Sequence, residues 1–185
     1  MTTGRAFGEL CSRGARDWAS YVEPQYQLLY ETVHDRLGIR NGTRLLDVGC
    51  GPGRAALLAA ERGAQVAGLD ASPDSIEAAR ERIPTGDFRV GDMEGLPWPD
   101  GAFDVVTGFN SFQFAGKPVV ALAEVRRVLG SAGSLPVAKR PPFPTSRAAQ
   151  AKQQEFHCSF ASSSGEWRHQ LPRIRQRFQS PNCRQ

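Results

Sequence analysis

Three glycines at alternating positions, Gly49, Gly51 and Gly53, follow a short apolar run and precede an Ala-rich stretch. Because glycine has no side chain, a ligand can approach the backbone N–H groups of such a loop closely. A dinucleotide-binding GxGxxG motif counted from Gly49 needs a small residue at position 54, where Arg54 stands. This spacing argues against NAD as the ligand. For the loop taken alone, the alternative to a ligand-binding loop is a tight turn without a ligand.

Two acids follow the loop at spacings that suit the ribose and the base of a bound nucleoside. Asp70 ends a second apolar run about 20 residues beyond the loop, where a carboxylate can accept hydrogen bonds from both ribose hydroxyls. Asp92 follows a third run and can accept a hydrogen bond from an exocyclic amine such as that of adenine. The structural alternatives are a favourable charge near a helix N-terminus for Asp70 and an exposed turn for Asp92.

Strands and helices alternate along the chain and must position these residues. Apolar runs without amphipathic alternation predict buried parallel strands, and runs of good helix formers predict helices. The predicted strands are 44–48, 65–69, 87–90 and 103–107, and the predicted helices are 26–37, 54–62, 73–82 and 118–129. This alternation predicts an α/β fold, a Rossmann-like doubly wound parallel sheet, with ligands at the carboxyl ends of its strands.

Four segments together resemble one enzyme family: LLDVGCGPG, the acid Asp70, GDMEGLPWPDGAFDVV and the helix ending EVRRVL. In this order they are similar to the class I S-adenosylmethionine-dependent methyltransferases, in particular the type 11 group of small-molecule enzymes. The resemblance covers roughly residues 38–129. It implies S-adenosyl-L-methionine as the cofactor and methyl transfer to a small-molecule acceptor as the activity.

The same resemblance implies a set of cofactor-binding residues. Asp47 and the glycine loop would lie against the methionine portion, Asp70 would hold the ribose, and the segments after the third and fourth strands would contact adenine and substrate. The full set is Asp47, Gly49, Cys50, Gly51, Gly53, Asp70, Ala71, Asp92, Met93 and Asn110.

No catalytic base is assigned, because a sulfonium methyl group is already activated and positioning can supply most of the catalysis. His34 lies outside the apolar positions of its predicted helix, so we expect it on a solvated face. Several aromatic residues have both a binding interpretation and a packing interpretation. Those of a substrate pocket would be Phe109, Phe112 and Phe114, and those of a lid over the cofactor would be Trp18, Tyr21 and Tyr26.

The pattern changes after Gly133. Pro136 lacks a ladder donor and weakens a fifth strand over 135–139, and the later residues are rich in Arg, Ser, Gln and Pro. We therefore expect an aberrant or truncated C-terminal part, without the last strands of the seven-stranded methyltransferase sheet. The predicted organisation is an N-terminal helical segment (1–37), a cofactor-binding domain (38–139) and a basic, poorly ordered tail (140–185). A truncated, catalytically impaired cofactor-binding protein is the alternative to an active enzyme.

Composition sets the broad class. A chain of 185 residues suits one domain, and its net charge of +4 comes from the residues after 130. This basic arm makes nucleic acid a partner to consider, although an unlikely one, and the oligomeric state is not predicted. The four cysteines form no CxxC pair, so no metal site is expected. Without a signal-like start or an apolar run of about 20 residues, a cytoplasmic protein without membrane contact is expected.

Overall fold

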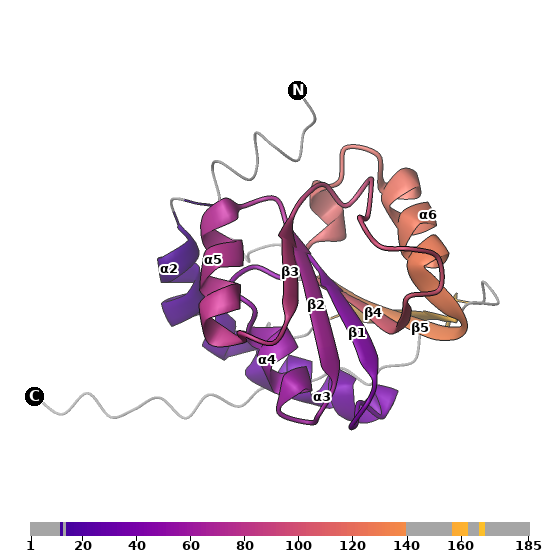
Figure 1. The fold of residues 1–185 in the computed structure, drawn as a ribbon, viewed down its shortest axis with the longest axis horizontal. Helices are drawn as coiled ribbons and strands as arrows, with labels where there is room; N and C mark the ends of the chain where they lie inside the picture. The colour runs from indigo at the N-terminus through magenta and orange to yellow at the C-terminus, as the bar shows by residue number, and fades with distance from the viewer. Residues whose placement is uncertain (1–11, 13, 140–156, 163–166, 169–185) are drawn as a thin grey trace, which may run out of the picture.

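The computed structural model describes residues 12, 14–139, 157–162 and 167–168. Its centre is a mostly parallel sheet with the strand order β3-β2-β1-β4-β5-β6-β7, and helices cover both faces (Figure 1). The Rossmann-like parallel sheet predicted from the sequence is thereby confirmed. Most of the predicted basic tail lies outside the described residues. Within the described residues, no helix has the length and apolar character to cross a membrane.

Four parallel strands and four helices follow the predicted alternation closely. Ser72 caps α5 by accepting a hydrogen bond from the Ser75 N–H (3.2 Å), and Gly38 ends α3 in the left-handed conformation. The strands are β1 (Arg44–Val48), β2 (Gln65–Asp70), β3 (Asp87–Val90) and β4 (Phe103–Phe109). The helices are α3 (Gln27–Leu37), α4 (Arg54–Ala60), α5 (Pro73–Arg82) and α6 (Pro118–Val128).

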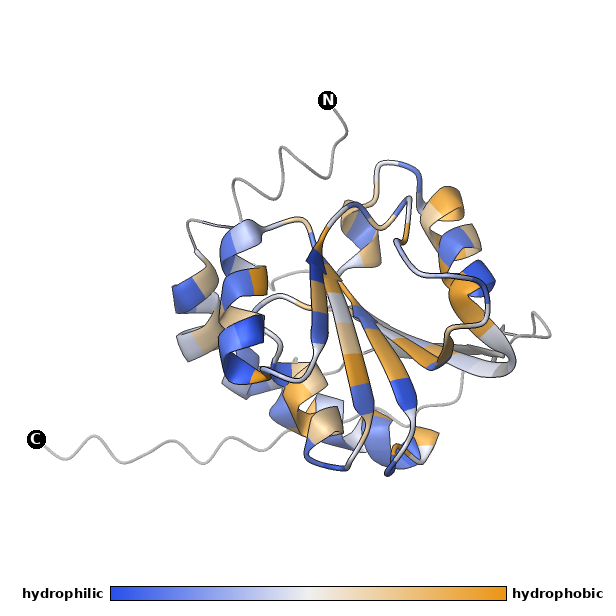
Figure 2. Cartoon of the chain, in the orientation of Figure 1, coloured by the Kyte–Doolittle hydropathy of each residue, from blue (hydrophilic) through white to orange (hydrophobic). Residues whose placement is uncertain are grey.

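Neighbouring residues of β1 point to opposite faces of the sheet and enter two different cores. Leu46 packs with Val106 and with α6 on one face, and Leu45 packs with α4 and α5 on the other. Figure 2 shows the apolar residues concentrated along the central strands. Because both faces are covered, β1 reads as a continuous apolar run rather than an alternating one.

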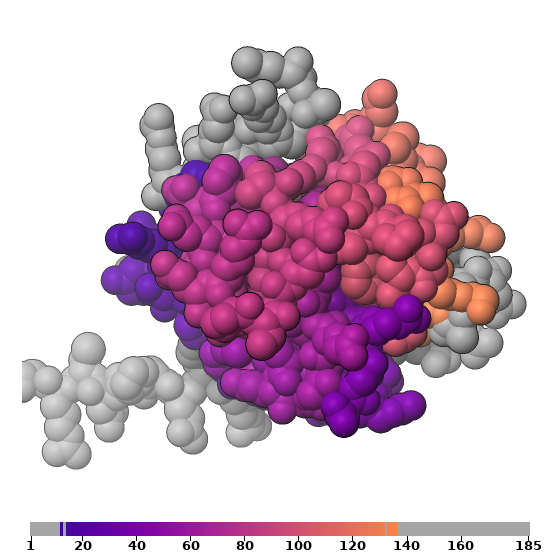
Figure 3. Space-filling view, in the orientation of Figure 1, coloured from indigo at the N-terminus to yellow at the C-terminus, as the bar shows by residue number. Residues whose placement is uncertain are grey.

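Short helical turns precede α3 and lie beside α5 (Figure 1). They are α2 (Ala15–Asp17), the π-helical η1 (Trp18–Val22) and the 3₁₀-helical η2 (Glu23–Tyr26). The hydroxyls of Ser12 and Ser72 are hydrogen-bonded at 2.8 Å, which joins this segment to the start of α5. Figure 3 shows the indigo surface of the segment beside the magenta surface of α5.

The expectation for His34 is wrong. Its side chain is fully buried in α3 and packs against Phe109 of β4, with ring centroids 6.4 Å apart. The apolar face of α3 is wider than its helical periodicity suggests, because the helix contacts α4 as well as the end of β4.

The fifth strand is longer than predicted, and β5 runs over Leu129–Lys139. It pairs in parallel with β4, and the register shifts between Phe103 and Val105. Pro136 lies inside the strand, so its lack of a ladder donor does not end the strand. The register shift lies at the start of the strand, between the partners of Leu129 and Ser134, and not at Pro136.

The expected loss of the last strands also needs correction. Residues His157–Ser162 form β6, antiparallel to β5, and Trp167–Arg168 form β7, antiparallel to β6. The sequence of these strands shows no clear alternation. Their pairing is instead with the free backbone groups on the outer side of β5, which a pattern of side chains does not encode.

Candidate functional site

A cleft of about 310 Å³ lies at the carboxyl ends of β1 to β4, with the N-terminal turns as its opposite wall. The end of each of these four strands contributes lining residues. All the predicted cofactor residues except Gly53 line this cleft: Asp47, Gly49, Cys50, Gly51, Asp70, Ala71, Asp92, Met93 and Asn110. The topology therefore gathers residues from positions 47 to 110 around one cavity, as the strand-end argument requires.

The glycines of the loop have different structural roles. All three have positive φ values, which favour glycine. A Cβ atom at Gly49 would collide with the Cβ of Ser111, so this glycine lets the β1 loop approach the end of β4. A Cβ atom at Gly53 would lie 3.1 Å from the Cβ of Ala79, so Gly53 serves the packing of α4 on α5 instead of lining the cleft.

Asp70 is held at the end of β2 by two backbone donors. The Gly51 N–H donates to Oδ2 (2.8 Å) and the Ser72 N–H donates to Oδ1 (2.9 Å). Burial raises the pKa of the Asp70 carboxyl, and these hydrogen bonds oppose that rise. Each carboxylate oxygen has a further lone pair for a ligand hydroxyl. The glycine loop and the acid thus form one rigid unit.

Asp47 is buried at the end of β1. The Thr107 hydroxyl donates to Asp47 Oδ1 at 2.7 Å. Burial raises the pKa of Asp47 to about 7, and the nearby charges of Asp70 and Glu23 raise it further, while the Thr107 hydrogen bond opposes the rise. A cation placed against this carboxyl would favour its ionised form.

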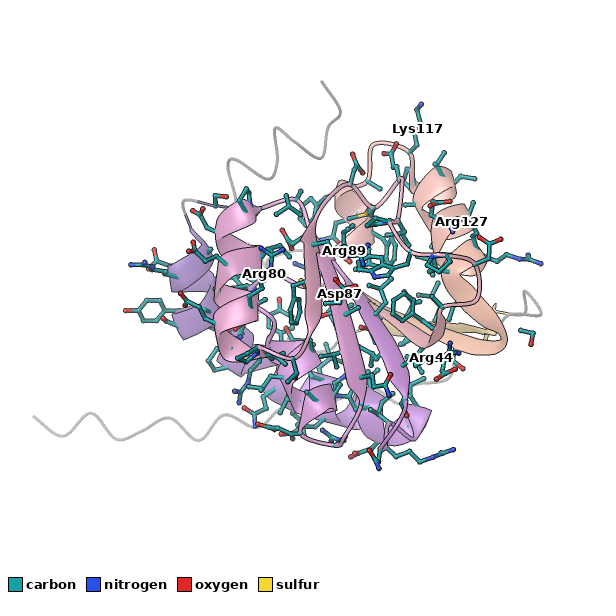
Figure 4. The ribbon with its side chains drawn as sticks, viewed as in Figure 1. Arg44, Arg80, Asp87, Arg89, Lys117 and Arg127 are labelled. Atoms are coloured by element: carbon teal, nitrogen blue, oxygen red, sulfur yellow. The ribbon has the colours of Figure 1, made fainter. Side chains whose placement is uncertain are left out.

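Asp92 and Met93 begin a loop that two arginines hold in place (Figure 4). The Arg89 guanidinium of β3 donates to the carbonyl of Pro97 (2.6 Å) and lies 4.8 Å from the ring centre of Trp98. The Arg127 guanidinium of α6 donates to the carbonyls of Leu96 (2.9 Å) and Trp98 (2.8 Å). These arginines act at a distance from the cleft by fixing the loop that carries its third acid.

The end of β4 has an unusual backbone and an unsatisfied hydroxyl. Asn110 has φ 56°, and among non-glycine residues asparagine tolerates this left-handed conformation best. Its Oδ1 accepts a hydrogen bond from the Gln113 side chain at 2.8 Å. The Ser111 hydroxyl is buried without a hydrogen-bond partner.

The N-terminal wall contributes Glu23 and Tyr30, which the sequence analysis did not identify. Glu23 is only 3% exposed, and its carboxylate accepts hydrogen bonds from the Arg82 guanidinium (2.8 Å) and the Arg54 N–H (3.1 Å). Burial raises the pKa of Glu23, and these partners oppose the rise. The Glu23 carboxylate therefore ties the wall to α4 and α5.

Aromatic rings line the same wall and continue to β4. The ring centroids are 6.4 Å apart for Trp18 and Tyr26, 6.1 Å for Tyr26 and Tyr30, and 4.8 Å for Tyr30 and Phe109. We call these four residues the aromatic row. The first two pairs are stacked, and the last pair meets edge to face.

The other aromatic predictions divide between the two interpretations. Phe114 lines the cleft and is 40% exposed, whereas Phe112 packs in the core beside α6. Tyr21 is 71% exposed and is not among the lining residues. No sequence pattern separates these cases, because each depends on tertiary packing around the strand ends.

Comparisons with known proteins agree with this geometry. Residues 46–137 match a family model described as a methyltransferase domain. A demethylmenaquinone methyltransferase of Renibacterium salmoninarum is 37% identical over 58% of this chain and 45% of its own length. A malonyl-[acyl-carrier protein] O-methyltransferase of Serratia marcescens is 37% identical over 50% of this chain and 36% of its own length.

A solved structure adds a relative with another reaction. The crystal structure of the [4+2]-cyclase SpnF is 34% identical, with a TM-score of 0.57, over 64% of this chain and 48% of that one. The chain thus spans less than half the length of these three relatives.

Proposed function

Residues 46–137 belong to the class I S-adenosylmethionine-dependent methyltransferase family, and from this premise we propose that the chain transfers a methyl group to a small molecule. The observation that carries the proposal is the rigid unit of Asp70 and the glycine loop, in the same cleft as Asp47 and Asp92. The cofactor is S-adenosyl-L-methionine.

The residues of the cleft fit this cofactor. Asp70 would hold the ribose hydroxyls, and Asp92, with Ala71 and Met93, would contact adenine. The methionine portion would lie against the glycine loop and Asp47, whose carboxyl suits its ammonium group. When bound, the cofactor supplies a methyl group on a positively charged sulfur, which a nucleophile can displace.

The same charges oppose a dinucleotide. Glu23, Asp47, Asp70 and Asp92 all line the cleft, and carboxylates at short range repel a pyrophosphate. Arg82 pairs with Glu23, but the described lining residues include no lysine or arginine that could bind the pyrophosphate. An NAD-linked reaction therefore finds little support.

The contribution of the chain to the reaction would be positioning. The end of β4 and the aromatic row line the cleft, where they would restrict the approach of an acceptor. Holding two reactants in line can lower a barrier by roughly 7–11 kcal/mol. This explains how such a site can work without a dedicated base when the acceptor is a good nucleophile.

Cofactor binding tests the proposal through Asp70→Asn. The change removes a charge-assisted acceptor, which is worth about 1.5–3 kcal/mol, so affinity should fall about tenfold to a hundredfold. Calorimetric titration with S-adenosylhomocysteine measures the loss, and circular dichroism checks the fold. The matched control is Asp35→Asn, because Asp35 is an exposed acid of α3 that pairs with Arg62 outside the cleft. Equal affinities for the two variants would contradict the proposal.

The likeness to a [4+2]-cyclase favours a second candidate function, in which a protein with this fold catalyses a reaction other than methyl transfer. The two candidates differ in turnover. Under the first, incubation with methyl-labelled S-adenosylmethionine and a panel of acceptors transfers label to one of them. Tight binding of S-adenosylmethionine with no transfer to any acceptor favours the second candidate.

A further inference from the structure

We propose that the acceptor is an uncharged molecule with a planar, apolar ring, and that acceptors bearing a carboxylate or phosphate beside the reacting atom are excluded. This inference rests on the proposed function and concerns the β4 end of the same cleft.

The order of the strands separates an acceptor end from a cofactor end. Along the sheet edge, the acids occur at the ends of β3 (Asp92), β2 (Asp70) and β1 (Asp47), in that spatial order. Neighbouring strands lie about 4.8 Å apart, so a cofactor extended across these three ends reaches β4 with its methionine portion. The end of β4 is then where the acceptor must meet it.

The walls at this end are aromatic. Phe109 and Phe114 come from the end of β4 and the turn that follows it, and Tyr26 and Tyr30 face them from the N-terminal wall. The ring centroids of Tyr30 and Phe109 are 4.8 Å apart, with an interplanar angle of 68° and an edge-to-face arrangement. Offset and edge-to-face ring contacts favour another ring over a flexible aliphatic chain.

The electrostatics at this end oppose a negative charge. Glu23 and Asp47 lie close enough to Tyr30 to raise the pKa of its hydroxyl well above 10, adding to the larger effect of burial. Burial and the two acids thus disfavour the phenolate of Tyr30. The same surroundings disfavour a carboxylate or phosphate bound next to that ring.

A matched pair of probes tests the inference. The chain is loaded with S-adenosylhomocysteine, and 2-naphthol and 3-hydroxy-2-naphthoate, which differ by one carboxylate, are titrated at pH 7.5. We expect 2-naphthol to bind at least tenfold more tightly. Equal or tighter binding of the naphthoate, or no binding of 2-naphthol, would overturn the inference.

A charge added to the cleft gives a second, independent readout. Phe114→Arg places a cation among the lining residues at a position that is 40% exposed, so the fold should tolerate it. The preference for 2-naphthol should shrink severalfold. The control is Val119→Arg in α6, at an 81% exposed position that is not among the lining residues, and it should keep the wild-type preference. The same preference in both variants would overturn the inference.

The loading step separates the two proposals. If S-adenosylhomocysteine itself fails to bind, the proposed function fails and this inference fails with it. If it binds and the naphthoate is preferred, only the acceptor class is wrong.

Discussion

Asp47 couples the charge of the cleft to pH. Its pKa of about 7 in the free protein lies far above the ordinary value of an aspartate, chiefly because the carboxyl is buried. In the proposed binding mode, the ammonium group of the cofactor would lie against this carboxyl and favour its ionised form. Affinity for S-adenosylhomocysteine should therefore rise about tenfold from pH 6 to pH 8 and level off above that.

Calorimetry at pH 6, 7 and 8 measures this dependence. In Asp47→Asn the affinity should be lower and should no longer change with pH, because the titrating group is gone. Asp35→Asn should keep the wild-type profile, since Asp35 pairs with Arg62 at the surface. A pH profile unchanged in Asp47→Asn would show that another group titrates.

His34 is expected to lower the stability of the protein in acid. Neither ring nitrogen has a hydrogen-bond partner, and burial lowers the pKa of His34 to about 4. Between about pH 6.5 and pH 4 the unfolded chain binds a proton that the folded chain does not. The free energy of unfolding should thus fall as pH falls through this range, by on the order of 3 kcal/mol from this residue.

Replacing His34 with leucine should remove that dependence. Leucine has a similar volume, favours helix and needs no polar partner, so the free energy of unfolding at pH 7 should rise by about 1 kcal/mol. Urea unfolding of both proteins at pH 7 and pH 5 provides the measurement. The difference in the free energy of unfolding between the two proteins should be larger at pH 5 than at pH 7. An equal difference at both pH values would argue against the buried neutral imidazole.

The site residues divide according to whether their position follows from the local sequence. Asp70 ends one apolar run and Asp47 lies one residue before the end of another, so the strand prediction alone places both at the ligand-binding edge. Glu23, in the turns before α3, and Tyr30, in α3, line the cleft only through tertiary packing against the strand ends. No residue spacing carries that information.

At the scale of elements, the tie between the N-terminal wall and α5 is the contact most open to test. Removing one partner of a buried pair leaves an uncompensated charge. Arg82→Met should therefore lower the free energy of unfolding by about 2–3 kcal/mol, because Glu23 stays buried at 3% exposure. Urea unfolding measures the change, and Arg62→Met, which affects a pair with an exposed acid, should cost less.

A double substitution distinguishes this explanation from simple loss of packing. Adding Glu23→Gln to Arg82→Met removes the stranded charge and keeps an acceptor for the Arg54 N–H, so part of the lost stability should return. Additive losses from the two substitutions would contradict the explanation.

The elements themselves were largely predictable where local signals suffice. The predicted limits of β1, β3 and α5 are those of the structure, because apolar runs and the Ser72–Pro73 start mark them clearly. The predicted strand over 135–139 is shorter than β5. Pro136 is a local signal against a strand, whereas the pairing of β5 with β4 leaves no local signal in the sequence. The same holds for β6, which depends on the free side of β5.

At the scale of the whole molecule, two apolar cores enclose one sheet, and the cleft lies along the carboxyl edge between them. Alternating strands and helices predict this layered arrangement, because each helix must bury its apolar side on the sheet. The path of the N-terminal turns does not follow from this alternation. The relatives that share the domain are more than twice as long as the segment they share with this chain, so the domain can be built into larger proteins.

The register of β1 against β4 has a consequence for biosynthesis. Leu45 pairs with Val105, whereas β2, the next strand in the sequence after β1, pairs with the other side of β1. At roughly 5–20 residues per second, a ribosome needs several seconds to deliver β4 after β1 has emerged. The residues at the end of β4 and in the turn after it line the cleft, so the cleft is complete only after translation has passed that turn.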